Sequence, residues 1–353
     1  MDRQGAVMTN VANPDLLYPE TRSRQRKLWL TIVMTLLFAT SCLSIFIGTH
    51  YIDPSVTLEA LFSFDPTNSD HLLVVHLRIP RTLLAVVVGA ALGVSGVIMQ
   101  GLTRNPLADP GILGVNAGAT VAVVSAIALF GITEMATVMW FGLLGAAVAG
   151  AGVFVLAGVN KGINPVKVVL AGTALSVVLL AFTHMITINS HETVFEQYRH
   201  WSVGSFQGRG YDVLIPATLL VAIGLVASFS LSKALDTVSL GEDIGHVLGV
   251  NPVRIWCFAS GAIVILAGSS TAAAGPISFI GLTAPHIARI VAGPDHKWLM
   301  PFSLLIASTL AVAADVLGRI VGYPNEISVG IMIALIGGPF FVFLVKRWKI
   351  SSL

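Results

Sequence analysis

The sequence predicts an all-α membrane protein with about ten transmembrane helices in one bundle. Of its 353 residues, 55% are apolar and only 11% are charged, whereas an ordinary soluble domain carries about 25% charged residues. Apolar runs of helix length, separated by proline, glycine or charged residues, recur along the whole chain. The basic residues are distributed unequally around these runs. The formal net charge of +2 is too small to indicate a nucleic-acid partner.

The first apolar run covers residues 28–48 and follows several basic residues, as the core of a signal peptide would. It is longer than a usual signal-peptide core, and no convincing small-residue cleavage site follows it, so we interpret it as the first membrane helix. Residues 1–27 are then expected to form a cytoplasmic tail, residues 28–349 the membrane domain and residues 350–353 a short C-terminal tail.

Nine further runs have the length and apolarity of membrane helices. They cover residues 82–102, 112–132, 136–158, 168–188, 213–232, 255–274, 277–292, 299–317 and 327–345. The segment 192–212 mixes charged and aromatic residues, so it is too polar to cross a bilayer and too apolar to lie free in water. We expect a short amphipathic helix at the membrane interface there.

The lysines and arginines orient these spans. With a cytoplasmic N-terminus and ten alternating spans, 15 of the 20 basic residues, including every lysine, fall in inner segments. The positive-inside rule therefore predicts that both termini are cytoplasmic. The basic residues left on the outer side are Arg78, Arg81, Arg199, Arg209 and Arg319.

Acidic residues are absent from the centres of the predicted spans. Ion-coupled transporters usually bind H⁺ or Na⁺ with a carboxylate or a broken helix near the midplane. The pattern therefore disfavours an ATP-independent secondary transporter, which remains the alternative from a different class. His184 and His286 lie inside spans, and we interpret them as interhelical hydrogen-bond partners rather than proton relays.

Small residues recur at helical spacing in two of the spans. Gly89, Gly93 and Gly96 form one stripe, and Gly142 and Gly145 belong to another; such stripes allow helix backbones to approach closely in lipid. In addition, the short sequence at 101–106 partly matches that at 281–286. The two would lie on opposite membrane faces, which is compatible with a five-plus-five inverted repeat.

Five motifs occur in order along the chain. They are LRIPRT with NPLADPGILGV, LGEDIGHVLGV, GPISFIGL followed by PH, ADVLGR and GGPFF. At these residues the sequence resembles the membrane subunit of the FecCD family, the permeases of binding-protein-dependent ABC importers for iron-siderophores, haem and vitamin B12. The resemblance extends over residues 28–349.

The resemblance implies ten helices per chain and a prokaryotic cytoplasmic-membrane location. A second permease chain, identical or homologous, would complete the translocation path, with two ATP-binding subunits inside and a substrate-binding protein outside. No G-x-x-x-x-G-K-[S/T] phosphate loop occurs in the sequence, so ATP is expected to bind a partner subunit and this chain is expected to be a transport subunit rather than an enzyme. No catalytic residue, metal ligand or cofactor is expected in this chain.

An iron-siderophore is the first expected cargo, with haem and then vitamin B12 as alternatives. Four histidines fall towards the outer half, but no paired spacing among them supports direct haem ligation. These are His76, His184, His191 and His200.

The resemblance also assigns an ATPase-coupling element to the cytoplasmic loop between residues 233 and 254. Its expected residues are Gly241, Glu242, Asp243, Leu248 and Gly249, where the family has a short helix that fits a groove on the ATPase. A plain polar loop is the alternative.

Arg78, Arg81 and Arg319 match positions where family permeases present basic side chains to the binding protein. Exposed guanidinium groups can bind carboxylates through two hydrogen bonds. Two alternatives stay open: Arg78 and Arg81 could anchor their span at the headgroups, and Arg319 could pair with Asp315 one helical turn away.

Overall fold

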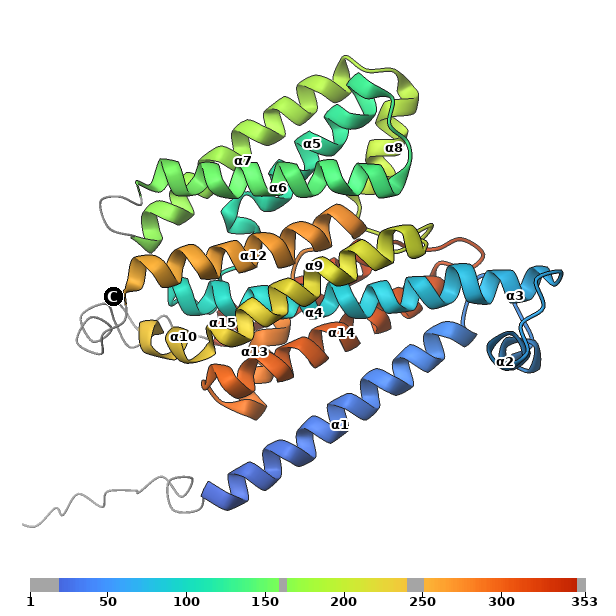
Figure 1. Cartoon of the computed structure of the whole chain (residues 1–353), viewed down its shortest axis with the longest axis horizontal. Helices are drawn as coiled ribbons and strands as arrows, with labels where there is room; N and C mark the ends of the chain where they lie inside the picture. Colours follow the sequence, from blue (N-terminus) through green and yellow to red (C-terminus); the bar gives the residue numbers. More distant parts are fainter. Residues whose placement is uncertain (1–18, 159–163, 240–250, 348–353) are drawn as a thin grey trace, which may run out of the picture.

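The computed structural model describes residues 19–158, 164–239 and 251–347, and within these ranges all regular secondary structure is helical (Figure 1). Eight helices are long and apolar enough to cross a membrane. They are α1 (Pro19–Phe46), α4 (Ile79–Thr103), α6 (Met135–Ala157), α7 (Pro165–Ile188), α9 (Tyr211–Ser230), α12 (Pro252–Ala274), α14 (His296–Val321) and α15 (Val329–Arg347). The prediction of an all-α membrane protein is confirmed.

Two further apolar helices are shorter, namely α5 (Val115–Phe130) and α13 (Ile280–Ala292). Each begins after a stretch of irregular backbone. The 3-10 turn η3 (Pro110–Leu113) precedes α5 and ends at Gly114, whose φ is +73°. Phe279, with a φ of +68°, precedes α13. The sequence overestimated both helices because these left-handed residues interrupt runs that are apolar throughout.

The outer segment between α1 and α4 contains structure that the hydropathy pattern did not indicate. Helix α2 (Pro54–Phe62) packs on the helical extension of α4 through a small cluster of Ile52, Ala60 and Val74. Helix α3 (Ser69–Leu73) and the π-turn η2 (Val74–Arg78) run directly into α4, so one helix of 35 residues extends from Ser69 to Thr103.

Pro80 therefore lies inside a continuous helix, which begins at Ser69, before the predicted start of the span near residue 82. A proline has no N–H group, and its ring clashes with the carbonyl four residues earlier. That carbonyl belongs to His76, which lies in the π-turn η2. The wider turn relieves the clash, so the proline is accommodated without ending the helix.

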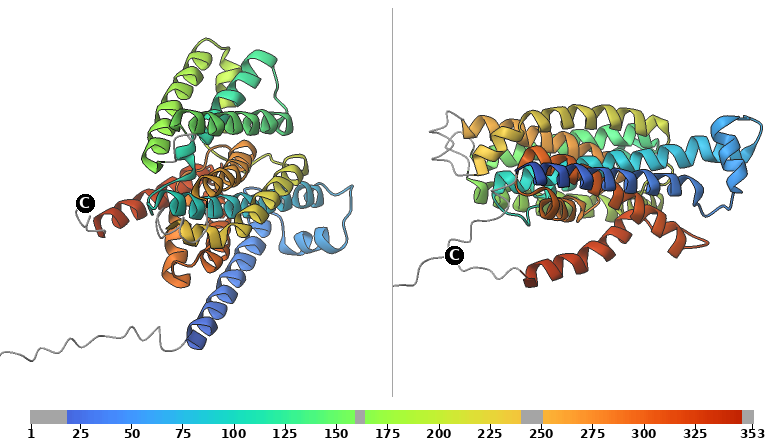
Figure 2. Two further views of the ribbon diagram at one scale, coloured as in Figure 1. Left: turned by 60° about the vertical axis from the view of Figure 1, so that its left-hand side comes forward. Right: turned by 90° about the horizontal axis from the view of Figure 1, so that it is seen from below.

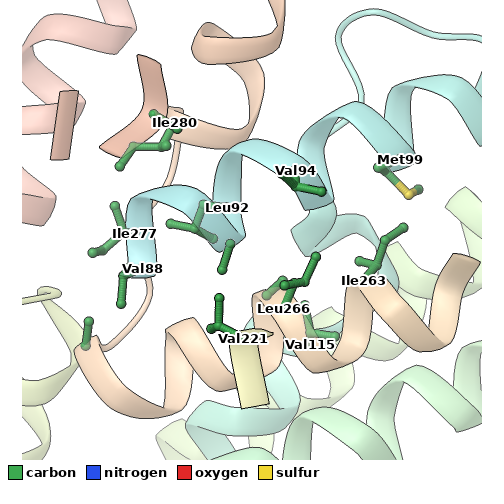
Figure 3. Close-up of a cluster of buried hydrophobic side chains, with 14 of the residues drawn as sticks. Val88, Leu92, Val94, Met99, Val115, Val221, Ile263, Leu266, Ile277 and Ile280 are labelled. Atoms are coloured by element: carbon green, nitrogen blue, oxygen red, sulfur yellow. The ribbon is translucent and has the colours of Figure 1, made fainter. Parts of the chain in front are cut away.

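Helix α4 occupies the centre of the bundle. Of its most apolar stretch, 83% is buried, and Val88, Leu92 and Val94 lie among side chains of α9, α12 and the 277–280 segment (Figure 3). The side chains of this cluster are apolar, and hydrogen bonds supplement them: the Ser303 and Ser308 hydroxyls of α14 donate to the Gly93 and Val86 carbonyl oxygens of α4.

The predicted small-residue stripes lie at helix contacts. A Cβ added to Gly96 would fall 1.9 Å from the Gly281 carbonyl oxygen of α13, and one added to Gly89 would fall 2.6 Å from the Ser308 Cα of α14. Helices α5 and α6 meet in the same way at Gly118 and Gly145. These glycines permit backbone contact, as expected for helices that associate in lipid.

Helices α1, α7 and α15 lie at the periphery of the chain. Only 6% of the apolar window of α1 and 17% of that of α7 are buried. Helix α1 begins at Pro19 rather than at residue 28, and it runs obliquely along one side of the bundle (Figure 1). The start of α1, the end of α15 and helix α10 (Ser232–Ser239) lie at one end of the molecule, opposite α2, α3 and α8 (Figures 1 and 2).

The interfacial segment forms helix α8 (Glu192–Ser202), which confirms the expected amphipathic helix in the first half of that segment. Trp201 is buried, whereas Arg199 and Glu196 form an exposed pair. The remaining residues, 203–210, form a loop that leads into α9.

Candidate functional site

The outer end of the bundle contains the three arginines that the sequence analysis assigned to docking. Arg78 donates hydrogen bonds to the carbonyl oxygens of Ile45, Phe46 and His50, at 3.0, 3.0 and 2.5 Å. The last carbonyls of a helix lack intrahelical partners and attract cations. Arg78 therefore caps the C-terminal end of α1 and attaches it to the central helix.

Asp315 of α14 lies between the other two arginines. Arg81 donates to both of its carboxylate oxygens, from Nη2 at 2.8 Å and from Nε at 3.0 Å. Arg319, one turn further along α14, donates to Asp315 from Nε at 3.1 Å and also from Nη2. The alternative in which Arg319 pairs with Asp315 is thus confirmed.

Arg319 also binds the end of α1, where Nη1 donates to the carbonyl oxygens of Ser44 and Ile47 at 2.8 and 2.6 Å. Arg78 and Arg319 are only 7% and 3% exposed. The expectation of freely exposed guanidinium groups is therefore wrong for these two residues, because α1 needs donors for its terminal carbonyls and Asp315 needs cations. The structure places them in an anchor for the C-terminal end of α1.

All three arginines nevertheless line one hollow of about 350 Å³ on the outer face. Glu326, which precedes α15, also lines it and accepts a hydrogen bond from Nη1 of Arg81 at 2.7 Å. Arg81 and Glu326 are the more accessible members, with side chains 12% and 14% exposed. The structure thus brings the three predicted residues together and adds two carboxylates that the sequence analysis did not assign to the site.

The predicted coupling residues Gly241, Glu242, Asp243, Leu248 and Gly249 lie outside the described residues. The helices on either side are described. Helix α10 ends at Ser239, and α12 begins at Pro252 with the Asn251 side chain accepting from the backbone of Arg254.

Helix α10 is attached to two other elements at the inner end. Asp236 accepts from the backbone N–H of His296 at 3.1 Å and contacts its Nδ1 at 2.6 Å, which joins α10 to the start of α14. Arg104, just after α4, donates to the Val238 carbonyl oxygen at 3.2 Å. Helix α10, which precedes the predicted coupling residues, is therefore fixed to the central helices.

A second outer cavity, of about 490 Å³, lies between α8, the start of α6 and the 205–209 loop. Its lining includes Trp201 and Arg209. Burial lowers the pKa of the Arg209 guanidinium to about 10, with a partly offsetting attraction from Asp212. The sequence analysis had placed Arg209 only among the outward basic residues, because its burial depends on long-range contacts of the loop.

The histidines considered for haem do not converge. His76 packs edge-on against Tyr211, His184 lies on the exposed surface of α7, and His191 precedes α8. His286 contacts the Phe340 ring of α15, an interhelical contact with an aromatic ring. Across the part of the chain that the structure describes, no three His, Cys, Asp or Glu side chains gather as a metal site.

The sequence pattern of the FecCD transport family matches residues 36–347. The chain belongs to this family. It is 41% identical over 316 residues to the ferric enterobactin transport system permease protein of Escherichia coli, covering 89% of this chain and 94% of that protein. It is 34% identical over 299 residues to the hemin transport system permease protein of Yersinia pestis, covering 84% and 89%.

A solved structure agrees with the fold. An inward-facing transporter described as a metal-chelate type ABC transporter matches with a TM-score of 0.79 and 28% sequence identity, covering 91% of this chain and 99% of the other. This FecCD chain is a multi-pass membrane permease of a bacterial ABC importer, and it is a transport subunit rather than an enzyme. The family assigned from the five motifs is confirmed.

Proposed function

We propose that this FecCD permease carries an iron-siderophore across the cytoplasmic membrane. The observation that carries the proposal is the 41% identity to a ferric enterobactin permease over 94% of that protein's length. Haem is the second candidate, because a hemin permease matches at 34% identity. Vitamin B12 is supported only by the breadth of the family.

The proposed assembly contains two permease chains, two ATP-binding subunits and an extracytoplasmic binding protein. The sequence has no phosphate loop, so the energy of ATP has to enter through a partner. The exposed apolar faces of α7 and α15, with 17% and 28% of their apolar windows buried, are available for a second permease chain or for lipid.

We extend the topology to ten crossings with both termini cytoplasmic by including the short helices α5 and α13 with the eight long spans. Each short helix follows a long central helix, α4 or α12, after an irregular stretch. Paired interrupted segments at corresponding positions are the mark of an inverted repeat, with irregular backbone near the substrate pathway. Their placement supports the five-plus-five arrangement.

For coupling, we keep Gly241, Glu242, Asp243, Leu248 and Gly249 as the contact with the ATPase. Helix α10, which precedes them in the chain, lies at the end of the bundle where the positive-inside rule places the cytoplasm. The bonds from Asp236 and Arg104 that fix α10 support this proposal, because a force applied at the segment would reach α4 and α14 directly.

For docking, we retain Arg78, Arg81 and Arg319 but change the mechanism. A carboxylate of the binding protein would enter the outer hollow and replace Glu326 as the partner of Arg81, which is the more accessible arginine. Arg81→Gln should weaken binding-protein affinity and lower its salt dependence, whereas Glu326→Gln, which frees the same guanidinium, should raise the affinity, since charge contacts govern association. An unchanged affinity and salt slope would leave the arginines with a structural role alone.

The decisive experiment is uptake into proteoliposomes that contain the permease and its ATP-binding subunits. We expect accumulation of a labelled ferric siderophore only with the binding protein outside and ATP inside. Hemin and cobalamin, offered in parallel, identify the cargo. Uptake driven by a proton or sodium gradient without ATP would support the alternative of a secondary transporter and contradict the proposal.

A further inference from the structure

The outer cavity of about 490 Å³ beside α8 is the feature from which we draw a further inference. Apolar walls are contributed by Ile132, Met135 and Val138, and the polar groups include Trp201, Gln207 and Arg209. Its lining contains no aspartate or glutamate. The volume falls within the range of small-molecule sites.

The loop that carries Arg209 is held by backbone hydrogen bonds to two helices. The N–H of Ser205 donates to the Ala274 carbonyl oxygen at the end of α12, at 2.7 Å, and the N–H of Gly330 in α15 donates to the Gly204 carbonyl oxygen at 3.1 Å. Gly208, with a φ of +69°, turns the chain just before Arg209. The arginine is therefore positioned by the fold and not by its own side-chain bonds.

Arg209 is only 4% exposed, yet its Nε has no hydrogen-bond partner among the described residues. Asp212 attracts the guanidinium, but the two form no ion pair within the described part of the chain. The Nε1 of Trp201, a residue that is 2% exposed, is also buried without a partner. Trp201 and Arg209, each with one buried donor that lacks a partner within the described ranges, thus belong to the lining of a cavity without carboxylates.

A buried cation without a hydrogen-bonded anion is costly. With a pKa of about 10, the Arg209 side chain remains protonated at neutral pH. The three docking arginines contrast with it, because each has carbonyl or carboxylate partners. Arg209 therefore differs from these three in having, among the described residues, no hydrogen-bonded anion or carbonyl to displace when it binds an incoming anion.

We propose that this cavity binds an anionic oxygen group of the cargo, with Arg209 as the principal donor and Trp201 as a second. The apolar wall would receive the ring or chain that carries the charged oxygen. The inference rests on the proposed import function and adds to it a preference for anionic chelates. A tris-catecholate complex of iron(III) is an anion, whereas a tris-hydroxamate complex is neutral. Comparing the two therefore shows whether the cavity recognises the negative charge of the chelate or binds any iron chelate.

The test is direct binding to the full-length permease in nanodiscs of zwitterionic lipid, with both iron(III) complexes as probes. We expect Arg209→Gln to weaken binding of the tris-catecholate complex roughly tenfold or more, since hydrogen bonds to charged groups are worth about 1.5–3 kcal/mol. Arg209→Lys, which keeps the charge, should restore part of the affinity. Arg199→Gln is the matched control, because that arginine is exposed and already paired with Glu196.

Equal affinity of wild type and Arg209→Gln for the anionic complex would overturn the proposal. So would an equal loss for the neutral complex. Inorganic phosphate and nanodiscs of anionic lipid are included as competitors: displacement by either as effectively as by the chelate would assign the site to a free phosphate or a headgroup. Because binding is measured without ATP, a failure of ATP-driven uptake would remove the proposed function and leave this result standing.

Discussion

Replacing Asp315 by asparagine should destabilise this FecCD permease strongly. The carboxylate is 2% exposed and accepts hydrogen bonds from both Arg81 and Arg319. Asparagine preserves the shape but removes the charge, and its NH2 group would face guanidinium donors. Removal of one partner from a buried ion pair costs about 3–5 kcal/mol, mostly because the remaining charge is left without compensation. We expect the loss in the free energy of unfolding to lie near the upper end of that range, because Asp315 pairs with two cations.

The free energy of unfolding, measured by titration with SDS in mixed micelles, checks this value. Glu196→Gln is the control, because it removes an exposed pair with Arg199 that should contribute at most about 1 kcal/mol. The double variant Asp315→Asn/Arg319→Gln should be less destabilised than the sum of its single changes, since it removes both charges of one pair. A cost for Asp315→Asn no larger than that of the control would refute the assignment of this carboxylate to a structural anchor.

Two further outcomes follow from the structure and the sequence. Gly96→Ala should destabilise the bundle by about 1–3 kcal/mol, because its Cβ would fall 1.9 Å from a backbone oxygen of α13. A Cβ added to Gly261 of α12 would have no atom within 4 Å, so Gly261→Ala should be neutral or stabilising in the same unfolding assay. Equal destabilisation by Gly96→Ala and Gly261→Ala would contradict this packing argument. Glu242→Arg and Gly249→Trp should each abolish transport and the stimulation of ATP hydrolysis in the partner subunits, while the permease still folds. If both variants stimulate ATP hydrolysis and take up cargo as the wild type does, the coupling contact lies elsewhere.

Apolar length and small-residue spacing predicted most of the helices, because both properties act locally. Helix α6 begins at Met135, one residue from the predicted boundary, and α7 ends at Ile188, as predicted. The short helices α5 and α13 were overestimated where a residue with positive φ breaks an apolar run. Hydropathy averages over such a residue, so the break cannot be recognised from composition.

The outer site shows where sequence patterns fail. The motifs brought Arg78, Arg81 and Arg319 into consideration, and the structure does gather them around one hollow. Their burial depends on α1, whose terminal carbonyls lie more than thirty residues away in sequence from Arg78. A charge pattern indicates that arginines lie on the outer side, but it cannot show which ones are already bound by backbone carbonyls.

Helix α4 connects the two regions proposed for docking and coupling. Its outer end carries Arg78 and Arg81, and Arg104 at its inner end holds the Val238 carbonyl oxygen of α10. At a rise of about 1.5 Å per residue, its 25 residues extend over about 37 Å, which exceeds the roughly 30 Å hydrocarbon core of a bilayer. Where glycines pack it against α13 and α14, no α4 side chain lies between the backbones to absorb displacement. A shift of α4 at its proposed docking end must therefore move α10, which precedes the proposed coupling residues, or else break the contacts that the glycines make possible.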